Sequence, residues 1–121
     1  MESLSGGKNE NNPLQAGHEP IQRTMNVRFL APAVQELEDA FEWYENQMPK
    51  LGYEFLDGID EAIHRTITWP ESNRNIGDNL HRCLVRRFPY CLIYGMEEQA
   101  LVIIAVAHLH RKPFYWTNRT S

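Results

Sequence analysis

The stretch ALVIIAVAHL, residues 100–109, decides the fold of this chain. It is almost entirely apolar and rich in β-branched residues, which favours a strand that is buried on both faces. A membrane-spanning helix needs roughly 18–20 consecutive apolar residues, and no apolar run in the chain approaches that length. We therefore expect residues 100–109 to form a central strand of a soluble domain.

Two further strands are predicted just before this one. Leu80–Arg87 alternates loosely between apolar and polar residues, Tyr90–Met96 is dense in β-formers, and Glu97–Gln99 supplies a turn. Residues 71–79, ESNRNIGDN, have the composition of a polar loop. The sequence thus predicts a three-stranded antiparallel meander that occupies the C-terminal half of the domain.

Two helices are predicted upstream of the meander, because apolar residues recur there at spacings of three or four. The first stripe is Val34, Leu37, Phe41, Tyr44 and Met48, and the second is Leu51, Phe55, Ile59, Ile63 and Ile67. Pro32 suits the first turn of the first helix, and Pro70 ends the second. Gly58 inside the second helix suggests a close approach between the helices. The short connection predicts an antiparallel hairpin.

Asn26–Leu30 reads as a short strand before the hairpin. The order strand, helical hairpin, three-stranded meander predicts an α+β fold with both helices on one face of the sheet. Residues 1–24 are polar and lack periodic apolar positions, so we expect a mobile leader, followed by a single domain over residues 25–119. The leader has no apolar core of a secretory signal, and two cysteines give no disulfide framework. A cytoplasmic protein is expected.

Charge is divided unevenly along the chain, although the total is only −4. Residues 25–73 carry 3 cations and 10 anions, whereas residues 74–121 carry 7 cations and 3 anions. Such an asymmetry is a hint about partners, and solvated acidic helix faces explain the middle block equally well. The negative total argues weakly against a nucleic-acid-binding protein.

The segment HLHRKPFYW, residues 108–116, is the densest group of chemically useful side chains. His108 and His110 would point to one side of a strand end, but zinc needs three or four ligands, so we predict no metal and no cofactor. Cys83 and Cys91 lie in strands that should be buried, where thiols tend to be inert, so a cysteine nucleophile is rejected. Phe114 and Trp116 are expected to pack over the sheet, and Pro113 is expected to start a short C-terminal turn or helix.

Arginines and aromatic residues gather on the predicted sheet. The candidate contact residues for a target or a partner protein are Arg82, Arg86, Arg87, Tyr90, His108, Arg111, Tyr115 and Trp116. Such a surface can hold phosphates and stack bases, or receive an acidic peptide. The alternative is that these charges only keep an exposed face soluble and an edge strand from aggregating.

From Met25 to Arg119 the chain resembles the RelE/ParE toxin superfamily of bacterial type II toxin–antitoxin systems, also called plasmid-stabilisation proteins. The residues that carry the resemblance are AVQELEDAFEWYENQMPKLG, GYEFLDGIDEAIHRTITWP, RRFPYCLIY and IIAVAHLHRKPFYW. The resemblance implies a strand, helix, helix, three-strand fold, a toxic intracellular target, and a cognate antitoxin. RelE-like members cut mRNA in the ribosome, whereas ParE-like members inhibit DNA gyrase.

The resemblance also implies where an RNA-cleaving member would carry its cations. Those positions fall on Cys91, on or near Leu84, and near Leu109, with Arg82 and Arg111 each displaced by two residues. Only Tyr115 matches well. The nuclease set is therefore largely absent or displaced, which favours the ParE-like branch.

We therefore expect a toxin without enzymatic activity that binds DNA gyrase and is neutralised by an antitoxin, either as a homodimer or as a toxin–antitoxin hetero-oligomer. The alternative is a ribosome-dependent mRNA endoribonuclease, an mRNA interferase. In that case His108 or His110, with Arg111 and Tyr115, would carry the chemistry, and Arg82 and Arg86 would help to hold the phosphate. A third reading is a homologue without toxicity.

Overall fold

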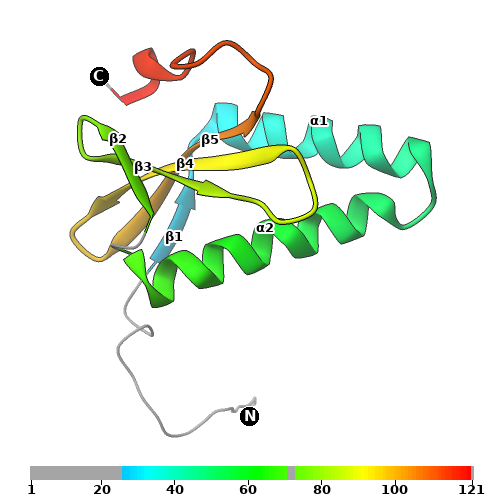
Figure 1. The fold of residues 1–121 in the computed structure, drawn as a ribbon, viewed down its shortest axis with the longest axis horizontal. Coiled ribbons are helices and arrows are strands. Elements are labelled where there is room, and N and C mark those ends of the chain that lie inside the picture. The colour runs from blue at the N-terminus through cyan, green and yellow to red at the C-terminus, as the bar shows by residue number, and fades with distance from the viewer. Residues whose placement is uncertain (1–25, 71–72, 121) are drawn as a thin grey trace, which may run out of the picture.

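The computed structural model describes residues 26–70 and 73–120, so the predicted leader of residues 1–24 lies outside the described residues. The elements follow the order expected from the sequence, with one addition (Figure 1). They are β1 (Asn26–Phe29), α1 (Ala31–Gln47), α2 (Leu51–Thr68), β2 (Arg74–Gly77), β3 (Leu80–Leu84), β4 (Tyr90–Glu97), β5 (Ala100–His108) and the short 3-10 helix η3 (Thr117–Thr120).

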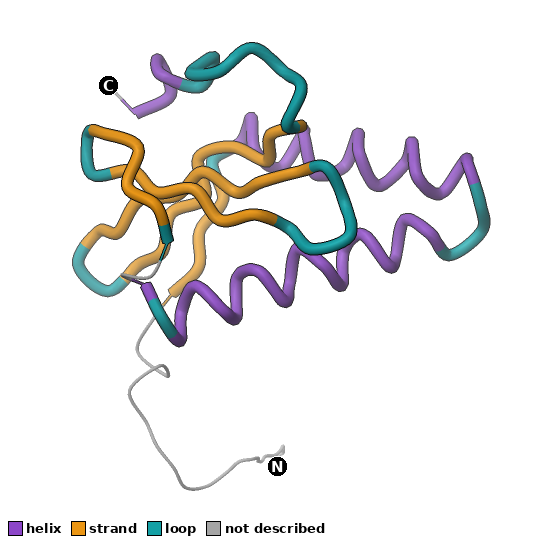
Figure 2. The backbone as a smooth tube through the Cα atoms, in the orientation of Figure 1, coloured by secondary structure: helices purple, strands orange, loops and turns teal. Residues whose placement is uncertain are grey.

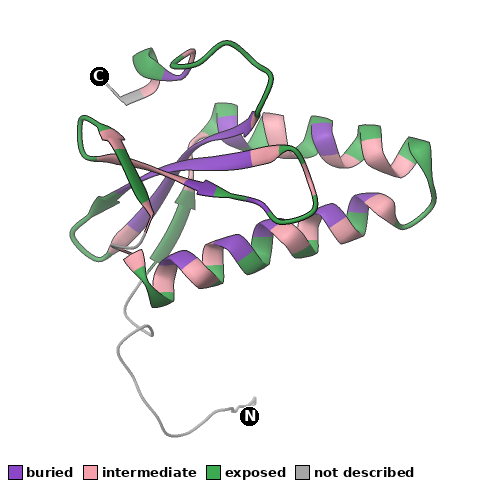
Figure 3. Cartoon of the chain, in the orientation of Figure 1, coloured by how far each residue is buried: buried purple, intermediate pink, exposed green. Residues whose placement is uncertain are grey.

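The strands form one five-stranded sheet in the order β1-β5-β4-β3-β2. The pairs β4–β5, β3–β4 and β2–β3 are antiparallel, as a meander requires, and β1 lies parallel to β5. Residues 101–107 of β5 are all buried, which confirms the prediction of an interior strand covered on both faces (Figure 3).

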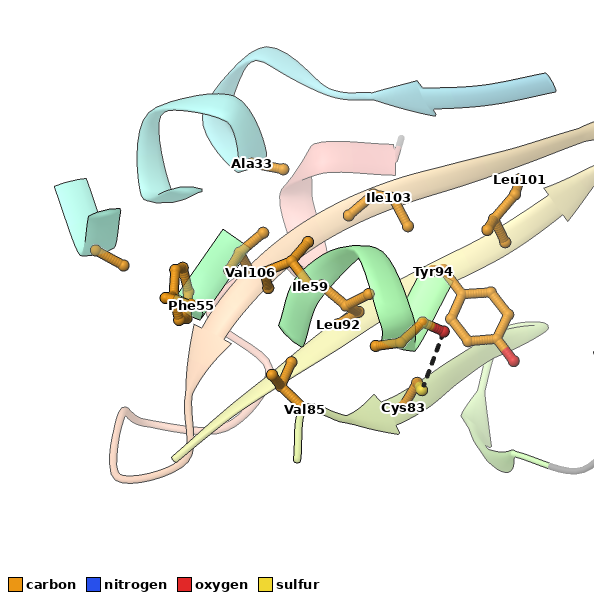
Figure 4. Packing of buried hydrophobic residues seen from close by; sticks show 12 residues of the cluster. Ala33, Phe55, Ile59, Cys83, Val85, Leu92, Tyr94, Leu101, Ile103 and Val106 are labelled. Atoms are coloured by element: carbon orange, nitrogen blue, oxygen red, sulfur yellow. Dashed lines mark hydrogen bonds between the residues drawn. The ribbon is translucent and has the colours of Figure 1, made fainter. Parts of the chain in front are cut away.

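Both helices pack on one face of the sheet, which confirms the predicted α+β architecture. Their apolar stripes meet alternate side chains of the strands, because successive side chains of a strand point to opposite faces. Figure 4 shows Phe55 and Ile59 of α2 against Val106 of β5 and Leu92 of β4. Pro32 lies in the first turn of α1 as predicted, and α2 ends at Thr68, before Trp69-Pro70.

The two helical glycines have different neighbours. A Cβ on Gly52 would lie 2.7 Å from the carbonyl oxygen of Phe41, so this glycine lets α2 approach α1. A Cβ on Gly58 would instead meet the side chain of Val85 at 3.2 Å. The prediction that Gly58 marks the contact between helices was wrong, because Gly58 faces the chain that follows β3.

The segment of residues 71–79 is not entirely a loop, since Arg74–Gly77 forms the edge strand β2. The polar composition of that segment suits a strand with little burial, which has no apolar alternation to reveal it. The strand predicted over Leu80–Arg87 is also too long and ends at Leu84. The chain turns there, with Arg87 at a positive φ of 73°, so Phe88 joins the core under the helices.

None of the helices in the described part of the chain is long and apolar enough to cross a membrane.

Candidate functional site

The C-terminal segment, residues 109–120, lies over the face of the sheet that the helices leave open. In Figure 2 this segment runs above the strands, whereas α2 runs below them. Trp116 is only 7% exposed and packs with Cys91 and Ile93 of β4 and Ala105 of β5. The expected packing of Trp116 is confirmed. The predicted packing of Phe114 was wrong, because this side chain is 58% exposed; its ring lies 5.6 Å from that of Trp116 between centroids.

The C-terminal segment is fastened to α1 by one carboxylate, that of Glu36. The Arg119 guanidinium donates to both oxygens of Glu36 at 3.0 Å, and the Tyr115 hydroxyl donates to Oε2 at 2.6 Å. The backbone N–H of Val106 donates to Oε1 at 3.0 Å, and Arg111 donates a longer bond of 3.4 Å. We call Glu36, Arg111, Tyr115 and Arg119 the Glu36 clamp.

The Glu36 clamp holds its carboxylate in the charged form. Burial alone would raise the pKa of Glu36, but the hydrogen bonds from Arg119, Tyr115 and Val106 outweigh it and lower that pKa below its ordinary value. The side chains of Glu36 and Arg119 are 14% and 17% exposed, so this ion pair is largely shielded from water and weakly screened by salt.

Tyr115 is poorly placed to exchange protons. Burial, and its hydrogen bond to the Glu36 carboxylate, raise the pKa of the Tyr115 phenol well above its ordinary value. Its ring also carries the Arg111 guanidinium at 3.7 Å and the Arg119 guanidinium at 5.0 Å from its centroid. In the clamp, Tyr115 is therefore a hydrogen-bond donor and a platform for cations.

A groove beside the clamp brings Arg111 of the clamp together with two other candidate residues, Tyr90 and His108. Tyr90, His108 and Arg111 line a depression of about 600 Å³ between α1 and the adjoining ends of β4 and β5, together with Trp43 and Tyr44. The ring centroids of Tyr90 and His108 lie 5.0 Å apart. The groove is open and aromatic, which suits a side chain of a partner protein.

His108 and His110 lie side by side, with ring centroids 5.1 Å apart. The Nδ1 atom of His108 accepts a hydrogen bond from the backbone N–H of His110 at 3.1 Å. Across residues 26–70 and 73–120, no group of three or more histidine, cysteine or acidic residues could hold a metal ion. Cys83 and Cys91 are buried as predicted, and burial raises the pKa of the Cys91 thiol to about 11.

The three arginines predicted from β3 and its turn do not lie together. Arg86 and Arg87 pair with Glu61 and Glu54 of α2, on the helical side of the molecule, at 3.5 and 3.1 Å. Arg82 lies in β3 opposite Ile93, and thus on the other face of the sheet. The cations that a single phosphate site would need are divided among three places.

Sequence reasoning missed Glu36 and Arg119 as parts of the site. Glu36 looked like one of several acidic residues on a solvated helix, and its partners lie 70 to 83 residues away along the chain. No local pattern joins residues at that separation. The only available signal was an acidic residue beside the apolar position Leu37 in the first turns of α1.

Comparisons with known proteins agree with this architecture. Residues 27–113 match the family model described as the ParE toxin of the type II toxin–antitoxin system, parDE. A solved structure described as the chromosomal ParDE toxin–antitoxin system from P. aeruginosa has a TM-score of 0.62 to this chain at 11% identity. The match covers 72% of this chain and 98% of that chain, and at this identity it shows the fold. No curated protein matches the chain.

Proposed function

The chain belongs to the ParE toxin family of type II toxin–antitoxin systems, and from this premise we propose that it inhibits growth by binding a cytoplasmic protein, with DNA gyrase as the favoured target. A cognate antitoxin would neutralise the toxin. In this proposal the toxin acts by contact and catalyses no reaction.

The Glu36 clamp is the observation that supports a contact mechanism. An RNA-cleaving toxin needs a group that can take a proton from a 2′-hydroxyl, and free cations to stabilise the phosphate. Here Tyr115 donates to Glu36, and both Arg111 and Arg119 are paired with the same carboxylate. The groups best placed for catalysis are thus used to hold the C-terminal segment against the sheet.

The antitoxin is proposed to cover the helical hairpin. Trp43, Met48 and Tyr53 are 59%, 52% and 59% exposed near the end of the hairpin where α1 connects to α2. Large apolar side chains that gather on a surface often mark a protein interface, and an amphipathic segment could bury them. The protein encoded beside this gene should therefore copurify with the toxin. Replacing Trp43 and Tyr53 with serine should weaken that association.

The test of the target is a supercoiling assay with purified gyrase and relaxed plasmid. The toxin should inhibit supercoiling in proportion to its concentration, and a premixed toxin–antitoxin complex should not. Normal supercoiling in a large molar excess of folded toxin would refute gyrase as the target.

A ribosome-dependent endoribonuclease is the second candidate, favoured by the groove in which Tyr90, His108 and Arg111 converge. Primer extension on an actively translated mRNA distinguishes the two. Cleavage within codons that His108→Ala abolishes would establish the nuclease and overturn the contact mechanism. Growth that stays normal after induction without the neighbouring gene would instead indicate a homologue without toxicity.

A further inference from the structure

Two arginines face each other directly across the β2–β3 pair. The register places Arg74 opposite Arg82, and directly opposed residues of an antiparallel pair point their side chains to the same face. Like charges in this relation destabilise a sheet. A cross-strand arginine pair therefore raises the question of what compensates the charge.

The arginine pair lies on the face of the sheet away from the helices. Arg82 is opposite Ile93, and Ile93 is opposite Ala105. Ile93 and Ala105 both pack with Trp116 under the C-terminal segment. The next row of the same face runs from Leu84 through Cys91 to Ala107. Leu84 is 50% exposed, so the C-terminal segment leaves the β3 side of this face open.

Nothing in the described part of the chain neutralises the pair. Every other arginine there makes an ion pair, and the carboxylates involved are Glu97, Glu61, Glu54 and Glu36. No ion pair or side-chain hydrogen bond joins Arg74 or Arg82 to residues 26–70 or 73–120. As far as residues 26–70 and 73–120 are concerned, the pair is open to solvent or to a bound anion.

We propose that Arg74 and Arg82 form a recognition site for a carboxylate side chain of an extended acidic segment on a partner protein, with an apolar side chain of that segment against Leu84. This inference rests on the proposed function to the extent that the partner is a protein. Guanidinium groups bind carboxylates through paired hydrogen bonds, and two at directly opposed positions, with Cα atoms about 5 Å apart, can bind one carboxylate together.

The spacing of residues along β3 supports an extended partner that lies on this face. Arg82 and Leu84 are two residues apart on β3 and point to the same face of the sheet. Side chains two residues apart on an extended segment also point to one face, about 7 Å apart. A carboxylate at the Arg74–Arg82 pair would then stand two residues from an apolar side chain over Leu84.

The charge of the whole molecule favours an acidic protein segment over a nucleic acid. A nucleic acid presents a continuous line of phosphates and needs a positive groove that follows it. This chain carries a net charge of −4, and the uncompensated cations on this face form a compact pair. Beside them, Leu84 is an exposed apolar side chain that a peptide can cover.

The test uses fluorescence anisotropy of the full chain at low ionic strength with three labelled probes. The acidic probe is a heptapeptide of the order glutamate, serine, valine, serine, glutamate, serine, valine, so that glutamate and valine are two residues apart on one face. The second probe is the same peptide with lysine in place of glutamate, and the third is a single-stranded oligothymidine. We expect the acidic peptide to bind at least tenfold more tightly than the other two. Tighter binding of the oligonucleotide, or no preference among the probes, would overturn the proposal.

Two double variants separate a local site from bulk charge. Arg74→Gln with Arg82→Gln should weaken acidic-peptide binding at least tenfold. Arg28→Gln with Lys50→Gln makes the same change in net charge elsewhere and should stay within twofold of the parent. An equal loss in both double variants would refute a specific site.

A single charge reversal provides a measurement that needs no partner. Arg82→Glu places an acidic side chain opposite Arg74, so the thermal unfolding midpoint should rise while acidic-peptide binding is lost. A lower midpoint would show that the two arginines are already compensated, and would refute the inference. Gyrase inhibition is assayed separately. Acidic-peptide binding without gyrase inhibition would refute only the proposed target, and gyrase inhibition without acidic-peptide binding would refute only this site.

Discussion

Replacing Glu36 with glutamine removes the charge at the centre of the clamp while keeping the shape of the side chain. The ion pair with Arg119 is largely buried, with the two side chains 14% and 17% exposed. Removing one partner of a buried pair costs about 3–5 kcal/mol, and a hydrogen bond to a charged group contributes about 1.5–3 kcal/mol. The glutamine oxygen can still accept one donor, so we expect Glu36→Gln to lower the free energy of unfolding by about 2–4 kcal/mol.

The assay is urea denaturation, followed by the fluorescence of Trp116 in a background where Trp43 and Trp69 are replaced with phenylalanine. Detachment of the C-terminal segment would expose Trp116 and shift its emission to longer wavelength before the sheet unfolds. Glu38→Gln is the matched control, because Glu38 is exposed on the same helix. A cost below about 0.5 kcal/mol for Glu36→Gln, the range of ordinary surface changes, with unchanged emission, would refute the reasoning.

The pH dependence of stability tests the same clamp. The pKa of Glu36 is lowered in the folded chain, so the unfolded chain binds the proton more readily. The stabilisation is then fully present above the unfolded pKa of about 4.3 and is lost as pH falls through the folded value. Between pH 7 and pH 3, the parent should therefore lose more stability than Glu36→Gln. Parallel stability curves for the two proteins would contradict this sign.

Three other predictions follow from the packing. Gly52→Ala should destabilise the chain by about 1–3 kcal/mol, because its Cβ would lie 2.7 Å from the carbonyl oxygen of Phe41; Gly58→Ala should cost less in the same denaturation assay, since the gain in helix propensity of about 1 kcal/mol offsets its milder contact. Trp116→Ala should cost about 3–5 kcal/mol, measured by denaturant midpoints. At pH 8, Cys91, whose pKa is raised to about 11, should react with a thiol reagent at least about 100-fold more slowly than an unfolded thiol; equal rates would show that the C-terminal segment does not cover it.

Local pattern was sufficient for the elements whose residues bury a regular stripe. The helical hairpin and β5 were predicted because spacing of three or four, or an unbroken apolar run, reports burial directly. β2 was missed because Arg74–Gly77 is an edge strand with little burial, and burial is the only signal that a periodic pattern carries. The end of β3 was misplaced because the turn depends on the backbone of Arg87.

Only some residues of the candidate site could be predicted from the sequence. The sequence placed Arg111, Tyr115 and Trp116 beside the sheet, and they do lie there, although their contacts with a target stay a prediction. The sequence did not show which contacts each of them makes. Trp116 packs against β4, whereas Arg111 and Tyr115 donate hydrogen bonds to Glu36. Arg74 attracted no notice in the sequence, because its significance lies in the residue opposite.

The sequence by itself determined the order of the elements apart from the edge strand β2, the packing of both helices on one face of the sheet, and the family to which the chain is similar. These depend on the periodic burial of residues that are neighbours along the chain. Only the tertiary structure decided how the charged side chains pair, because Glu36 meets Arg119 across 83 residues and Arg74 meets Arg82 through the register of two strands. Electrostatic partners are set by distance in space, which hydrophobic periodicity does not encode, so the Glu36 clamp and the open arginine pair appear only in the folded chain.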